Sequence, residues 1–213
     1  MKKMLFVVIM SLMVMSVGFC QRSVTSSTDY FNVPTATILP AGTASVAVQA
    51  AGNQIWGQDN NVGVIVDVGV SNRIGISATT DIKDFDRDNI VAGVKFIAGE
   101  SDEVSDNGQL ALFLYNVGRS RTAIPGLSLT VQSADVKWLS WTVSGWYVDN
   151  NWQGGLGATA TLTTNFNLQA EYSSTGKLVG GVGLSYKNLF AEARFLDQSN
   201  ELYGAAGVKF PVW

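Results

Sequence analysis

Apolar and polar residues alternate along the chain from Thr43 onward, in short segments separated by turn residues. In residues 62–70, every second position is valine, and glycine, isoleucine or aspartate lies between. A period of two is typical of a β-strand whose two faces meet different surroundings. Similar alternation or apolar character predicts further strands near residues 44–50, 74–79, 90–96, 108–117, 126–135, 138–148, 156–163, 166–173, 177–187, 189–195 and 201–210.

These segments predict an all-β chain of about twelve strands, with ten as the alternative because the division of residues 126–148 into two strands is open. The connections differ in length along the chain. Tight turns are expected at residues 71–73, around 165 and at 187–188, and longer polar connections at 52–61, 81–89 and 117–126. Short turns at one end and longer loops at the other are typical of an outer-membrane barrel. Residues 98–108 break this rule, because they form a long connection on the short side.

The first twenty residues have the form of a secretory signal peptide, with Lys2 and Lys3 followed by an apolar run. Cys20 lies where a lipidation motif would place it, but bulky Phe19 precedes it, so we favour removal of Cys20 with the leader. After the leader, no segment approaches the ~20 apolar residues of a spanning helix. We therefore expect a signal peptide at 1–20, an irregular periplasmic lead-in at 21–42 and a barrel domain at 43–213.

Strand length and aromatic placement favour a membrane barrel over a β-sandwich. Ten residues at ~3.3 Å each, tilted by ~40–45°, rise roughly 24 Å, which matches the ~25 Å apolar band of such barrels. Trp138, Trp146, Trp152 and Trp213 lie near the expected strand ends, as in aromatic girdles. Trp141 lies within a strand, which fits packing in a core better. The prediction is a closed antiparallel up-and-down transmembrane β-barrel.

The polar face of the predicted strands consists mainly of small residues with a few charges. Six of these are expected in the lumen: Asp67, Lys95, Glu171, Glu192, Arg194 and Lys209. Their signs balance, which favours internal ion pairs over a strongly ion-selective channel. We expect Ile65, Trp146 and Phe190 to fill part of the lumen, and glycines 180, 181 and 183 to make room for Phe190 or Tyr203.

Composition excludes most familiar active sites. The chain has no His and one Cys, so imidazole catalysis, His-ligated metals and internal disulfides are absent. The net charge of −3 and the lack of a basic stripe argue against nucleic-acid binding. Asp84, Asp86 and Asp88 have calcium-loop spacing, but Asn89 and Lys95 stand where the loop needs Gly and Glu. We expect a solvated acidic loop, with no catalytic residues, cofactor or metal.

The chain ends in an alternating segment that stops on an aromatic residue. Gly207, Phe210, Val212 and Trp213 resemble the C-terminal insertion signal of outer-membrane barrels, although Trp213 replaces the commoner Phe. Pro211 suggests that strand pairing ends at Phe210. The resemblance implies outer-membrane lipid and the barrel-assembly machinery as partners.

By its pattern, the region from Thr43 onward resembles the porin-like class of outer-membrane β-barrels. Residues 34–43, PTATILPAGT, are also similar to the opening of YjbH-like barrels, which are associated with exopolysaccharide. We therefore expect a structural or narrow-pore role in the cell outer membrane, without catalysis. One alternative is an envelope protein associated with polysaccharide, and the other is a secreted, soluble all-β binding protein.

Overall fold

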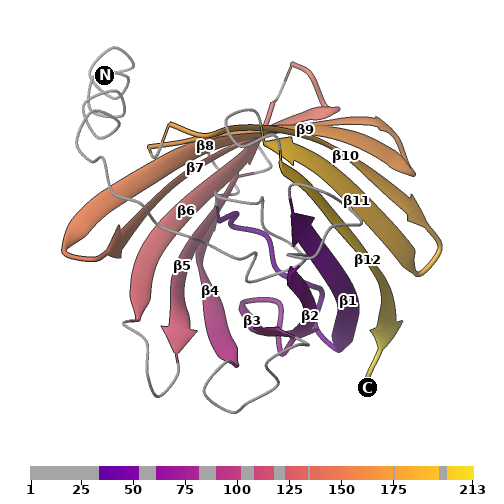
Figure 1. Cartoon of the computed structure of the whole chain (residues 1–213), viewed down its shortest axis with the longest axis horizontal. Helices are drawn as coiled ribbons and strands as arrows, with labels where there is room; N and C mark the ends of the chain where they lie inside the picture. Colours follow the sequence, from indigo (N-terminus) through magenta and orange to yellow (C-terminus); the bar gives the residue numbers. More distant parts are fainter. Residues whose placement is uncertain are drawn as a thin grey trace.

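The computed structural model describes residues 34–52, 61–81, 90–101, 108–117, 123–133, 135–174, 176–196 and 201–213. In these ranges, twelve antiparallel strands form one closed barrel, and each strand pairs with its neighbours in sequence (Figure 1). The strands are β1 (Thr43–Gly52), β2 (Asn61–Gly69), β3 (Ile74–Asp81), β4 (Val91–Ser101), β5 (Gly108–Val117), β6 (Ile124–Gln132), β7 (Leu139–Val148), β8 (Asn151–Thr163), β9 (Phe166–Ser173), β10 (Leu178–Tyr186), β11 (Leu189–Leu196) and β12 (Glu201–Pro211). The all-β barrel prediction is confirmed, and residues 126–148 contribute two strands.

Pairing of the first strand with the last closes the barrel. The register of β1 and β12 runs from Thr43 opposite Pro211 to Gly52 opposite Leu202. Closure gives both edge strands hydrogen-bond partners, which hydrocarbon could not provide. Pairing does not stop at Phe210, as the sequence suggested, because the Val212 amide beyond the proline donates to the Gly42 carbonyl at 2.7 Å. Pro211 is tolerated because it is the last residue of its strand.

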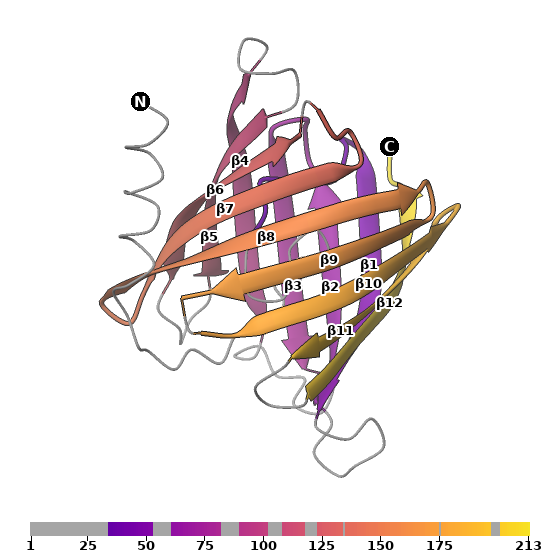
Figure 2. The same cartoon turned by 90° about the horizontal axis from the view of Figure 1, so that it is seen from above.

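The strands tilt strongly around the barrel. In Figure 2, β8, β9 and β10 on the near wall cross β1, β2 and β3 on the far wall at a steep angle. Opposite walls of a closed barrel cross in this way because every strand tilts by ~35–45° from the barrel axis. Strands of 8 to 13 residues are long enough to cross an apolar layer at such a tilt.

The period of two separates the two faces of the wall. In β2, Val66 points outward and is exposed, whereas its neighbours Ile65 and Asp67 point inward and are buried. Around the barrel, large aliphatic side chains dominate the outer face, with Val48, Leu112, Leu184 and Leu189 each at least half exposed. Within the described residues, no helix is long and apolar enough to span a membrane.

The connections place the start of β1 and the end of β12 at the same end of the barrel. The turn at residues 70–73, the two-residue turns at 164–165 and 187–188, the start of β1 and the end of β12 all lie there, and we name it the turn end. At the opposite end, Asp149 and Asn150 join β7 to β8, with φ angles of 49° and 62°. Two successive left-handed residues form the type I′ turn that matches the twist of a hairpin.

Candidate functional site: the inner wall of the barrel

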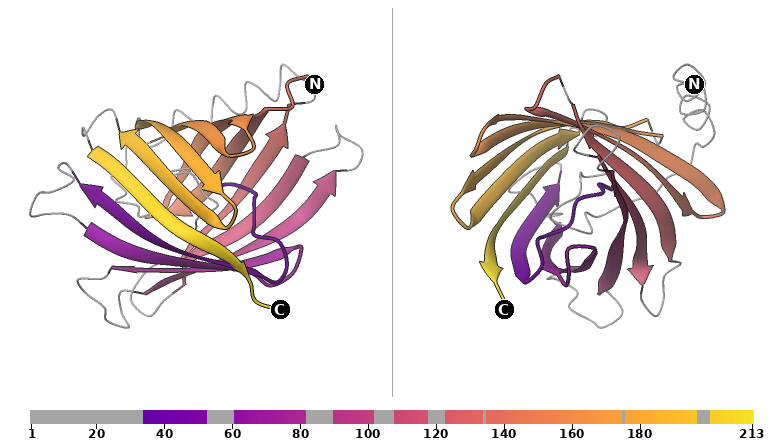
Figure 3. Two further views of the ribbon diagram at one scale, coloured as in Figure 1. Left: turned by 90° about the vertical axis from the view of Figure 1, so that its right-hand side faces the viewer. Right: turned by 180° about the vertical axis from the view of Figure 1, so that it is seen from behind.

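Residues 34–42, named the strap here, run inside the barrel from the start of β1 (indigo in Figures 1 and 3). Their contacts follow the inner face of six consecutive strands, β2 to β7. At the β1 end, the Gly42 amide donates to the Gly69 carbonyl at the end of β2, at 2.8 Å. On β3, a Cβ added to Gly75 would lie 3.0 Å from the Ile38 side chain, so the missing side chain makes room for the strap.

Polar side chains of the wall bind the middle of the strap. On β4, the Lys95 ammonium donates to the Thr37 carbonyl at 3.0 Å. On β6, the Thr130 hydroxyl oxygen accepts a bond from the Ala36 amide, also at 3.0 Å. Ala36 itself is fully buried in an apolar cluster with residues of β4 and β5. The wall thus supplies hydrogen-bond partners to backbone groups in the middle of the strap.

The strap is also bound where its described part begins. The Pro34 carbonyl accepts hydrogen bonds from the hydroxyls of Ser128 on β6 and Ser144 on β7. Both serines are buried. A carbonyl has two lone pairs, so these two donors use its full capacity. The strap thus lies against half of the twelve strands along a defined path.

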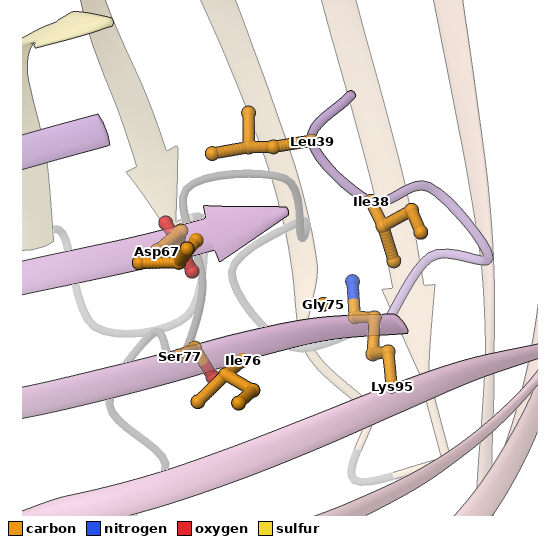
Figure 4. Close-up of a pocket in the computed structure, with 8 residues that line it drawn as sticks. Ile38, Leu39, Asp67, Gly75, Ile76, Ser77 and Lys95 are labelled. Carbon is orange, nitrogen blue, oxygen red and sulfur yellow. The ribbon is translucent and has the colours of Figure 1, made fainter. Parts of the chain in front are cut away.

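Little space remains between the strap and the wall beneath it. Figure 4 shows the pocket at this contact, where Ile38 and Leu39 of the strap face Asp67, Gly75 and Lys95 of the wall. Its volume is about 10 Å³, which is near the minimum that holds one water molecule. At this contact, the strap packs closely against the barrel wall.

The six charged residues expected in the lumen lie at different depths. Asp67, Lys95, Glu171 and Arg194 are buried. Glu192 is partly buried, and Lys209 is exposed. Asp67 and Lys95 lie beside the strap. On the uncovered side, Arg194 and Glu192 form an ion pair. Lys209 lies near the turn end, with its ammonium 5.2 Å from the centre of the Phe190 ring.

Arg194 is held among groups of neighbouring strands. Its guanidinium carbon lies 5.7 Å from the ring centre of Tyr203 on β12, in addition to the ion pair with Glu192. Arg194 and Glu192 are two residues apart on β11, so both side chains face the same way. The pair keeps both charges inside the barrel without an uncompensated ion.

A chain of hydrogen bonds continues from Tyr203 along the wall. Its hydroxyl donates to the Gln49 side-chain oxygen on β1 at 3.0 Å, and the Gln49 amide donates to the Thr79 hydroxyl on β3 at 3.3 Å. The Thr79 hydroxyl donates to the Val64 carbonyl on β2 at 3.1 Å. The sequence reasoning did not single out Gln49 or Thr79, although both occupy inward positions of the alternating pattern.

The residues expected to fill the lumen do so in two places. Ile65 belongs to a buried cluster with Tyr203, against which Phe190 packs. Trp146 is buried against Phe113 and its neighbours, and its indole N–H donates to the Gln153 side-chain oxygen at 2.9 Å. Trp146 therefore points inward and does not belong to an aromatic girdle.

Trp141 has the opposite orientation from the one expected. Its side chain is on the outer face near the start of β7, where 52% of its surface is exposed, so its assignment to a core is wrong. At the other end of the same wall, Tyr147 and Trp152 lie with ring centres 5.6 Å apart on the outer face. Outward aromatics at both ends of β7 match the girdles at the two interfaces of a membrane.

The glycines of β10 make room for different side chains than expected. A Cβ on Gly181 would lie 2.7 Å from Arg194, and a Cβ on Gly183 would lie 2.6 Å from Asn167. Phe190 packs instead on Gly207 of β12. The prediction that the glycines of β10 accommodate Phe190 or Tyr203 is therefore wrong.

The residues of the C-terminal pattern lie at the β1–β12 seam. Gly207 faces inward beneath Phe190, whereas Phe210, Val212 and Trp213 are exposed at the turn end. The role of these residues in membrane insertion stays a prediction.

The three aspartates at positions 84, 86 and 88 and Cys20 lie outside the described residues. Within the described ranges, no group of three Asp, Glu, Cys or His residues is placed to hold a metal ion.

Two solved structures share this architecture. The chain is similar to a KdgM porin in complex with disordered oligogalacturonate, with a TM-score of 0.54 and 12% identity over 78% of this chain and 98% of the porin. It is similar to a second KdgM porin structure with a TM-score of 0.51 and 14% identity over the same shares of the two chains. No family model matches the sequence, and no curated protein matches it.

The closed barrel of twelve strands, its aliphatic outer face and the likeness to porin folds agree with one another. An outer wall of this kind is stable in a bilayer, whereas water would leave a continuous apolar surface exposed. The chain therefore has the fold of the outer-membrane porins to which it is similar, a closed β-barrel with an apolar outer face.

Proposed function

We propose that the protein is a narrow outer-membrane pore for small polar solutes, and that the strap restricts its cross-section. The observation that supports this most directly is the strap's path along β2 to β7, fixed by hydrogen bonds from Lys95, Thr130, Ser128 and Ser144. Any passage then lies beside the uncovered strands, β8 to β12 and β1. Because short turns face the periplasm in such barrels, the strap lies toward the periplasmic end.

The uncovered wall is polar and carries no large net charge. Asn167, Gln169 and Glu192 are partly exposed there, and Arg194 beneath them is buried in an ion pair. The other two inward charges of this wall, the buried Glu171 on β9 and the exposed Lys209 on β12, are also of opposite sign. A wall with balanced charge favours neither cations nor anions strongly, so we propose weak ion selectivity.

The ligand named for the KdgM porin is not proposed for this chain. Oligogalacturonate is a polyanion, and a path for a polyanion needs an excess of positive charge along it. Here the accessible carboxylate of Glu192 lies directly on the uncovered wall, and the nearby Arg194 is neutralised by it. The charge distribution therefore supports small neutral solutes better than acidic oligosaccharides.

The alternatives from the sequence have less support. The stretch that resembles YjbH-like barrels includes the strap, which lies inside the barrel with residues 34–36 and Leu39 buried, and it is poorly placed to dock a polysaccharide. A soluble binding protein would have to leave the aliphatic outer wall in water. We propose no catalytic role, because the chain has no His and the acid–base mechanisms of familiar barrel hydrolases depend on it.

Planar-bilayer recording of the purified protein tests the proposed pore. The full mature chain should give small, stable conductance steps with a reversal potential near zero in a salt gradient. A variant that lacks residues 34–41 should give larger steps with the same weak selectivity, because the half of the wall under the strap becomes open. A heat-induced shift in gel mobility should first confirm that both proteins form barrels.

The same recordings separate a pore from a purely structural barrel. If the full chain is silent and only the shortened variant conducts, the strap plugs the barrel and the structural role holds. Silence of both folded proteins would contradict the pore.

A further inference from the structure

The uncovered wall contains a group of four polar side chains arranged around two glycines. Asn167 and Gln169 lie on β9, Glu192 and Arg194 on β11, and Gly181 and Gly183 of β10 between them. In the register, Gly183 is opposite both Asn167 and Glu192, and Gly181 is opposite both Gln169 and Arg194. Because all these positions face inward, the four side chains lie around a patch of wall that has no side chain of its own.

The two glycines allow the side chains on either side to lean over β10. The close approach of Asn167 to Gly183 and of Arg194 to Gly181 leaves no room for a Cβ at either glycine. Neighbouring strands are ~4.8 Å apart, so β9 and β11 are separated by roughly 10 Å. Side chains that lean inward over the glycines from both sides shorten this separation and form one polar surface, named the quartet here.

Hydrogen bonds within the quartet use some of its polar groups and leave others available. The Gln169 amide donates to the Asn167 side-chain oxygen at 3.1 Å, while the Gln169 side-chain oxygen is buried and accepts no hydrogen bond within the described residues. One Glu192 carboxylate oxygen pairs with Arg194. The other carboxylate oxygen of the partly exposed Glu192 and the amide N–H groups of the partly exposed Asn167 remain available to a ligand, and the hydrogen bond from Gln169 orients Asn167.

We propose that the quartet is a binding station for neutral, polyhydroxylated solutes such as short sugars. A hydroxyl both donates and accepts, so it can donate to the Glu192 carboxylate and accept from the Asn167 amide. The Glu192 carboxylate disfavours an anion at the same place. Arg194 is almost fully buried and acts on the solute by holding Glu192 in position.

This station rests on the proposed pore, because a solute reaches it only through the lumen. The strap contacts described above involve β2 to β7, so β9 to β11 face the open side of the barrel. A narrow passage with one weak station slows a matching solute as it passes, which makes binding visible as a partial, saturable block of the ion current.

Maltotriose, a neutral trisaccharide, serves as the probe, and trigalacturonate serves as its anionic counterpart. Maltotriose should reduce the bilayer current of the full chain in a saturable way, and trigalacturonate should be the weaker blocker. Gln169→Ala and Asn167→Ala should each weaken maltotriose binding about 3- to 10-fold, as the loss of one neutral hydrogen bond predicts. Glu192→Gln should bring the two sugars closer in affinity.

Gln109→Ala is the matched control, because Gln109 is an inward amide of β5 on the strap-covered side. Equal maltotriose affinity in Gln109→Ala and Gln169→Ala, or no saturable effect on a conducting channel, would overturn the station and leave the pore intact. Titration calorimetry of the detergent-solubilised protein with maltotriose is independent of conduction. If the protein does not conduct, binding that is lost in Gln169→Ala still supports the station, and absence of binding overturns it.

Discussion

Gly69 lies directly beneath the carbonyl of Pro40, and a Cβ added to Gly69 would be 2.2 Å from that oxygen. Because the last residue of β2 has no side chain, the strap has room to turn from the start of β1 into the lumen. The contact is with backbone atoms, so a side-chain rotation cannot relieve it. Even an alanine at position 69 should therefore displace the strap, and we expect it to leave the rest of the barrel wall unchanged.

Gly69→Ala should displace the strap and increase single-channel conductance, because the added methyl group and the Pro40 carbonyl cannot occupy the same place. Gly180→Ala is the control, since a Cβ there meets no atom within 4 Å. Both variants should keep the heat-modifiable mobility of a folded barrel. Unchanged conductance in Gly69→Ala would mean that the strap does not limit the passage.

Replacing Ser128 and Ser144 together by alanine should loosen the strap at the other end of its path. The buried Pro34 carbonyl would lose both of its wall donors, which costs about 1–3 kcal/mol when no water replaces them. We expect more frequent current fluctuations and a lower temperature for the gel-mobility shift. Ser140→Ala, a change on the same face of β7 nearer the turn end, provides the comparison. Equal behaviour of the two variants would argue against the Pro34 contact.

Arg194→Met should destabilise the barrel and make the pore cation-selective. Removing one partner of a buried ion pair costs about 3–5 kcal/mol, and we expect the lower end because the Glu192 side chain keeps 17% of its surface exposed. The unpaired carboxylate then attracts cations into the passage. The reversal potential in a salt gradient measures this shift, and Arg194→Lys should restore most of the original value. A reversal potential that stays near zero in Arg194→Met would contradict the arrangement.

Gly207→Val should impair closure of the barrel. A Cβ on Gly207 would lie 2.4 Å from the Val46 carbonyl oxygen across the seam and 2.7 Å from Phe190. We expect a smaller fraction of heat-modifiable protein after refolding into lipid vesicles. Gly204→Ala, whose Cβ would come no closer than 3.8 Å to another atom, should refold normally. If Gly207→Val refolds as well as the wild type in vesicles but inserts poorly in cells, the residue acts as an insertion signal instead.

The orientation of the two tryptophans in β7 is open to a spectroscopic test. Lipids brominated near the headgroup should quench the fluorescence of Trp141 and leave that of Trp146 unaffected, since only Trp141 is exposed on the outer face. Single-tryptophan proteins, with the other tryptophans changed to phenylalanine, allow each signal to be read alone. Quenching of Trp146 would place it outside the barrel and contradict the structure.

The strands were predictable because a period of two runs through most of the wall and is interrupted by register shifts only in β4 and near the end of β8 among the described pairings. The valines of β2 show it most plainly, and its parity places Asp67 and Ile65 on the inner face. Parity also shows why Trp141 was misplaced. Trp141 and Trp146 are five residues apart in one strand, so they must face opposite sides. An inward Trp146 therefore requires an outward Trp141.

The position of the strap and the composition of the quartet could not be predicted from the sequence. Residues 34–42 were expected to be irregular, but Ser128 and Ser144, which bind their backbone, look like any other inward serines. The quartet depends on register, because Asn167 and Glu192 come together only when both are opposite Gly183. Glu192 and Arg194 are two residues apart in one strand, so their side chains face the same side. Internal ion pairs could therefore be predicted from the sequence alone.

The strap also constrains the order in which the molecule is assembled. Its donors Ser128 and Ser144 follow Pro34 by 94 and 110 residues in the chain. Contacts between such distant residues are slow to form, since the loop-closure entropy is lost before the contacts contribute. The first described residues to be synthesised can thus reach their final place only after β6 and β7, which hold them, have formed. We expect a folding barrel to have a wider bore until the strap is in place.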